Sequence, residues 1–143
     1  MFSTGAQALV VGATLSAAAA LAHLACIALG APAYRFMGAG ERMARAVEAR
    51  KVRPTLVTLA ISAVLLFWAA YALGAAGVID QLPFSGLVLP AICAVYLGRA
   101  LAFPLLKPVF PENSLTFWVV SSSICLAIGL VHLYGVVAVW HTL

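Results

Sequence analysis

Charged residues are scarce in this chain of 143 residues: lysine, arginine, aspartate and glutamate together make up 8% of it, against 65% for hydrophobic residues. A soluble domain of this length could not bury so much apolar surface. The few charges also gather in short segments and leave long stretches almost uncharged. The composition therefore excludes an ordinary soluble domain and indicates a protein embedded in lipid.

Carboxylates are missing from every long apolar stretch, and several catalytic signatures are missing from the whole sequence. There is no P-loop for phosphate, no H-E-x-x-H and no G-x-S-x-G. A small proton-coupled cation exporter is also disfavoured, because such exporters bind cation and proton alternately at a carboxylate inside the membrane. We therefore predict no catalytic residue.

Cysteine is limited to three residues, Cys26, Cys93 and Cys125, each in a different apolar stretch and without C-x-x-C spacing. This pattern predicts neither a disulfide framework nor a zinc site. Buried free cysteine usually packs as a small apolar residue. No metal and no cofactor are predicted.

Four apolar stretches fill most of the chain, at about 6–31, 54–78, 84–106 and 115–140. At a rise of about 1.5 Å per residue, each reaches roughly 35 Å and can cross a hydrocarbon core of about 30 Å. A cleaved secretory signal is the alternative for the first stretch, but a basic leading region is missing and the stretch is too long. We predict an all-α polytopic membrane protein with one domain, 1–143, and four transmembrane helices in an up-down bundle.

The basic residues predict the orientation of these helices. The loop 32–53 carries six of them, Lys107 follows the third stretch, and the loop 79–83 has only Asp80. By the positive-inside rule, the first and third loops are cytoplasmic and both termini lie outside the cytoplasm, in a multi-pass protein of the cell inner membrane. The basic charge thus suits anionic lipid, and no nucleic-acid partner is predicted.

Small and polar residues recur at helical spacing within the spans. Because lipid gives helices no hydrophobic reason to associate, such stripes mark the faces where backbones approach closely. We predict helix packing inside the chain, with a second copy or with a membrane partner, along these residues: Gly12, Ser16, Ser62, Ser122, Gly129 and His132.

The basic loop is predicted to contain a short interfacial helix over Glu41 to Val52. Glu41 and Arg45 are spaced i,i+4, and Met43 and Val47 add apolar surface beside arginines that would face headgroups. The alternative is a cytoplasmic extension of the second span that ends at Pro54.

Ionisable residues inside a span are costly and are candidates for function. His23 and His132 invite a haem hypothesis, but at about 24 and 12 Å below the outer surface they fall in different leaflets. Arg99 lies near the level of His23, and Tyr96 shares its face. If the basic loop folds back, His23, Tyr96, Arg99 and Glu41 form a ligand site for an anionic headgroup or a small acid. The alternative is that Arg99 extends to cytoplasmic headgroups.

The stretch Tyr96-Leu97-Gly98-Arg99, together with the chain length and the basic first loop, is similar to the membrane-associated eicosanoid and glutathione enzymes (MAPEG). That resemblance implies a membrane enzyme acting at the cytoplasmic end near Arg99. The Asn and carboxylate that this family carries before its second helix are replaced here by Arg50-Lys51-Val52-Arg53-Pro54-Thr55.

Three functions therefore remain open from the sequence. The first is an oligomeric or accessory helical bundle that contacts lipid or a membrane partner. The second is the MAPEG-like enzyme, and the third is a subunit of an oligomeric transporter or channel.

Overall fold

The computed structural model describes residues 3–143, which contain α-helices and one 3-10 turn but no strand. The predicted all-α class is confirmed. The elements are, in chain order, α1 (Thr4–Leu29), α2 (Ala31–Phe36), α3 (Glu41–Glu48), α4 (Val52–Ala75), α5 (Ser85–Leu101), α6 (Phe103–Leu106), α7 (Leu115–Ala138) and the 3-10 turn Trp140–Thr142.

Three helices, α1, α4 and α7, are long and apolar enough to cross a membrane, with 26, 24 and 24 residues. They match the predicted first, second and fourth spans closely. Side-chain caps explain two of the starts: Ser3 accepts a hydrogen bond from the Ala6 N–H, and Ser114 accepts one from the Phe117 N–H. Each cap satisfies a backbone donor that the helix leaves free.

The third predicted span, 84–106, is wrong as a single helix. The structure divides it into α5, with 17 residues, and α6, with a break at Ala102. Pro104 accounts for the break, since it has no N–H to donate to the carbonyl of Ala100 and its ring would clash with that carbonyl. The described residues therefore hold three helices of full spanning length and not four.

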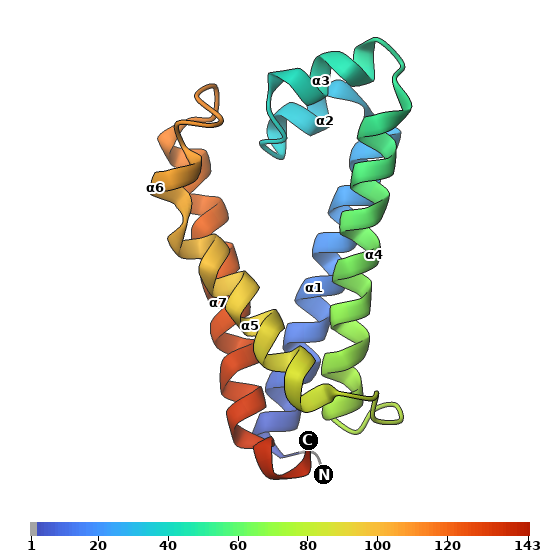
Figure 1. Ribbon diagram of the computed structural model, residues 1–143, viewed down its shortest axis with the longest axis vertical. Helices are drawn as coiled ribbons and strands as arrows, with labels where there is room; N and C mark the ends of the chain where they lie inside the picture. The colour runs from blue at the N-terminus through green and yellow to red at the C-terminus, as the bar shows by residue number, and fades with distance from the viewer. Residues whose placement is uncertain (1–2) are drawn as a thin grey trace.

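The four longer helices form two antiparallel pairs, α1 with α4 and α5 with α7 (Figure 1). The pairs meet near the chain termini and diverge toward the end that carries α2, α3 and α6. We call residues 3–20, 65–96 and 128–143 the terminal half, and residues 21–64 and 97–127 the loop half.

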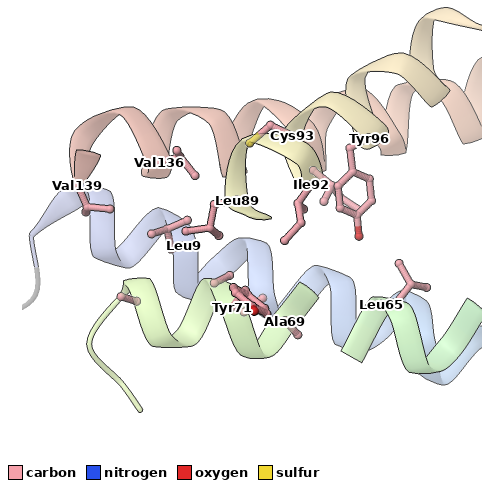
Figure 2. Close-up of a cluster of buried hydrophobic side chains, with 14 of the residues drawn as sticks. Leu9, Leu65, Ala69, Tyr71, Leu89, Ile92, Cys93, Tyr96, Val136 and Val139 are labelled. Carbon is pink, nitrogen blue, oxygen red and sulfur yellow. The ribbon is translucent and has the colours of Figure 1, made fainter. Parts of the chain in front are cut away.

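The hydrophobic core lies in the terminal half. Every buried member of the main cluster falls there, including Leu9, Leu89, Ile92 and Val136 (Figure 2). Close packing depends on small residues: a Cβ added to Gly12 would lie 2.7 Å from the His132 ring. Such close approach lets the two pairs pack against each other.

All six residues predicted to pack between helices are buried in the structure. Gly129 lies against Leu97, and Ser62 donates hydrogen bonds to the carbonyls of Ala20 and Thr58. Ser122 and His132 belong to α7, where their faces turn away from the exterior.

The basic loop folds into two short helices, which with their connection we call the strap, residues 31–48. Its second helix ends at Glu48, earlier than the predicted Val52, and a turn with Arg50 at φ 53° separates it from α4. That stretch is therefore not an extension of α4. Tyr34 holds the strap to α4, because its buried hydroxyl lies 2.9 Å from that of Thr58.

Candidate functional site

The four residues predicted to form a ligand site lie in separate surroundings. His23 places its Nδ1 2.7 Å from the Ala19 carbonyl of its own helix. The Tyr96 hydroxyl lies 2.8 Å from that of Ser16, and its ring stacks on His132 within the core. Glu41 lies on the strap, and Arg99 contacts α7. The structure does not bring these residues together.

The two histidines lie at different levels of the bundle. The His132 ring packs on Gly12, eleven residues before His23 on the same helix. Eleven residues of α-helix correspond to about 16 Å. Within residues 3–143, no three histidine, cysteine or acidic side chains form a group that could hold a metal ion.

Arg99 lies in the last turns of α5, half-buried against α7. One guanidinium nitrogen, Nη2, donates to the Ser121 hydroxyl at 3.2 Å, and the guanidinium carbon lies 5.2 Å from the centre of the Trp118 ring. The other, Nη1, is buried without a partner. Two polar atoms of α7, Trp118 Nε1 and Ser122 Oγ, are also buried without a hydrogen-bond partner. Their residues are only 2% and 9% exposed. We call Arg99, Trp118 and Ser121 the Arg99 site.

The charge of Arg99 is not neutralised by a carboxylate of the described chain. The ion pairs of residues 3–143 join Arg35 and Arg45 to Glu41, and Arg35 to Glu48. A guanidinium keeps its charge at any reachable pH and presents N–H donors in a plane, which suits carboxylate and phosphate oxygens. Arg99 Nη1 and Trp118 Nε1 are therefore two buried N–H donors without a partner, and they belong to two residues whose side chains contact each other.

A second polar cluster fixes the strap to the loop before α7. The Glu112 carboxylate accepts the Glu41 N–H at 2.7 Å, and Asn113 donates to the Gly38 carbonyl at 3.1 Å. A Cβ on Gly38 would overlap the Phe117 ring, so only glycine fits there. This cluster, which we call the latch, joins the two helix pairs where they diverge.

Ion pairs stabilise the strap, and the ionised Glu112 carboxylate stabilises the latch. Hydrogen bonds from Arg35 and Arg45 lower the pKa of Glu41 from 4.5 to about 2, and the Glu41 N–H lowers the pKa of Glu112. Hydrogen bonds to Glu41 and Glu48 raise the pKa of Arg35. All three side chains therefore stay ionised at neutral pH, and the strap keeps its contacts.

Sequence reasoning identified Arg99 but not its neighbours. Trp118 and Ser121 are spaced i,i+3, so they share one face of α7. Their depth in the fourth apolar stretch, similar to that of Arg99 in the third, could have predicted the contact. The contact between Glu112 and Glu41 spans 71 residues of sequence and pairs two acids, so no local pattern indicates it.

Comparison of the chain with protein-family models, with curated proteins and with solved structures gives no match. The resemblance of the stretch Tyr96-Leu97-Gly98-Arg99 to the MAPEG enzymes stays a prediction.

Proposed function

We propose that the chain is a multi-pass protein of a bacterial inner membrane, with both termini outside the cytoplasm, that binds an anionic amphiphile at the Arg99 site. In this topology α5 makes the fourth crossing despite its shorter length. Membrane lipid covers the outer apolar surface of the four long helices. A second copy or a membrane partner would contact this outer surface in place of lipid. The observation that carries the binding proposal is the buried Nη1 of Arg99, which has no hydrogen-bond partner.

The outer surface supports the membrane setting. Large apolar side chains are exposed on all four long helices, for example Leu21, Leu66, Leu87 and Val137 at 63, 46, 72 and 65%. A soluble monomer rarely exposes apolar surface so extensively. Several polar side chains of these helices, among them Ser16, Ser62 and His132, are instead buried.

The chemistry of the Arg99 site supports an oxyanion with an apolar tail. An arginine inside a membrane-crossing segment is costly unless it reaches a partner or water. A carboxylate or phosphate on the guanidinium would pair Nη1, and the Trp118 indole N–H can donate to the same group. Exposed Leu101 and Val119, near Arg99 along α5 and α7, give the tail an apolar surface.

Orientation is tested with single cysteines and a maleimide that does not cross membranes. We expect Asp80→Cys to be labelled on intact cells and Lys107→Cys only after permeabilisation, because these positions lie in loops on opposite sides. The reverse pattern would contradict the orientation, and labelling of both on intact cells would contradict the number of crossings.

Ligand binding is tested by thermal unfolding of the purified protein with laurate and with dodecanol, which has the same tail without the charge. We expect laurate alone to raise Tm by several degrees, since binding to the folded state stabilises it. Arg99→Gln should remove that shift, whereas Lys107→Gln, which removes an exposed cation, should keep it. Equal shifts with both additives, or a full shift in Arg99→Gln, would refute the site.

Glutathione serves as a third additive for the enzyme alternative. A shift with glutathione that Arg99→Gln removes would favour the MAPEG-like enzyme over the amphiphile-binding protein. The enzyme and the oligomeric transporter or channel otherwise remain predictions.

A further inference from the structure

A pocket of about 350 Å³ lies between the strap and α4, away from the Arg99 site. The residues that line it are three apolar ones, two basic ones, a tyrosine and a threonine: Ile27, Val47, Val52, Arg50, Lys51, Tyr34 and Thr55. Its size is at the lower end of small-ligand sites, which run from about 300 to 1,000 Å³. It therefore suits a headgroup rather than a whole lipid.

The two cations of this pocket are free to bind a ligand. Neither Arg50 nor Lys51 takes part in an ion pair of residues 3–143. Both are exposed on the short turn between α3 and α4. Neighbouring guanidinium and ammonium groups together suit a phosphate, which accepts several charge-assisted hydrogen bonds.

The position of the pocket decides which phosphate reaches it. Ile27 is in the last turn of α1 and Val52 is the first residue of α4, so the pocket opens where these two helices leave the apolar region. In the proposed topology this is the level of the cytoplasmic headgroups, and anionic lipids are enriched in that leaflet. The apolar wall would contact the glycerol and the first carbons of an acyl chain.

We propose that this pocket binds the headgroup of an anionic phospholipid, with the phosphate at Arg50 and Lys51 and the upper acyl chain against Ile27 and Val52. The proposal rests on the membrane topology proposed above but not on the Arg99 site. The chain would then have a second ligand site, on the α1–α4 pair. This site would bind a lipid rather than a free acid.

The test uses native mass spectrometry of the protein exchanged into detergent with phosphatidylglycerol or phosphatidylcholine. We expect one phosphatidylglycerol to remain bound, with at least fivefold less bound phosphatidylcholine. Arg50→Gln/Lys51→Gln should lose the retained lipid. The matched control Arg42→Gln/Arg53→Gln removes the same charge from residues that do not line the pocket, and it should retain the lipid. Gln at position 50 keeps the backbone strain of Arg50 unchanged.

Two further variants separate the pocket from general charge attraction. Val47→Trp should fill the pocket and release the lipid with every cation in place. Arg99→Gln should retain it, so failure of the amphiphile site leaves this result unchanged. Equal loss in both charge-removal variants, or retention in Val47→Trp, would overturn the proposal. Displacement of the lipid by glycerol 3-phosphate at equal concentration would show that the pocket binds free phosphate esters instead.

Discussion

The two halves of the bundle are held together by different forces. In the terminal half, small residues let four helices approach closely around Leu9, Leu89 and Ile92. In the loop half, each helix pair buries its own polar contacts, and the latch joins the pairs through two hydrogen bonds, one of them to the Glu112 carboxylate. Close packing therefore makes the terminal half the more stable one, whereas the loop half can separate at little cost in packing.

The largest expected effect comes from breaking the packing of the terminal half. Gly12→Leu would force its side chain into the His132 ring, whose atoms lie 2.7 to 3.0 Å from an added Cβ. We expect a loss of about 3 kcal/mol in the free energy of unfolding. Chemical unfolding in mixed micelles measures it.

Gly98→Leu is the matched control for that substitution. Nothing lies within 4 Å of a Cβ at this position of α5. The free energy of unfolding should change by less than about 0.5 kcal/mol. Similar losses in the two variants would mean that close approach at Gly12 does not hold the terminal half together.

A smaller effect is expected from breaking the latch. Gly38→Ala combines a positive φ of 73° with overlap of the Phe117 ring. We expect the strap to leave the loop before α7, with a global loss of about 1 to 2 kcal/mol. Spin labels at Arg42→Cys and Lys107→Cys should report a longer and broader distance by electron resonance.

Gly30→Ala is the control that separates the backbone strain of an alanine at positive φ from the overlap with Phe117 that Gly38→Ala also causes. Gly30 has a similar φ of 76°, but nothing lies within 4 Å of its added Cβ. Because Gly30 also has ψ −157°, in a region that is essentially restricted to glycine, the variant should cost about 1 to 3 kcal/mol, and it should leave the spin-label distance unchanged. If it opened the strap as Gly38→Ala does, the latch would depend on strain alone.

The smallest effect is a dependence of the latch on pH. The ionised acceptor of the latch is the Glu112 carboxylate, and the Glu41 N–H holds its pKa below the ordinary 4.5 in the folded protein. The contribution of Glu112 is therefore complete above about pH 4.5 and is lost as the pH falls through its lowered pKa. The same spin labels should show the strap leaving the loop before α7 as the pH falls below about 4.5, while the terminal half stays folded. Glu112→Gln should remove the pH dependence.

Local patterns predicted α1, α4 and α7 well, because an uncharged run of more than twenty residues leaves a chain in lipid little choice but helix. They failed at Pro104, since neighbouring helices decide whether a proline kinks or ends a helix. Arg99 was found because an isolated charge in an apolar run is visible in sequence. Its partners Trp118 and Ser121 depend on how α5 and α7 align, which no local pattern records.

The short length of α5 has a consequence for the surrounding bilayer. Its 17 residues rise about 26 Å, less than a hydrocarbon core of about 30 Å, whereas α1 rises about 39 Å. Lipid beside α5 would thin locally to match it, and lipid beside α1 would not. Headgroups and water would then dip toward the end of α5 where Arg99 lies. The protein would thus lie between thicker and thinner membrane, with the half-buried Arg99 on the thinner side.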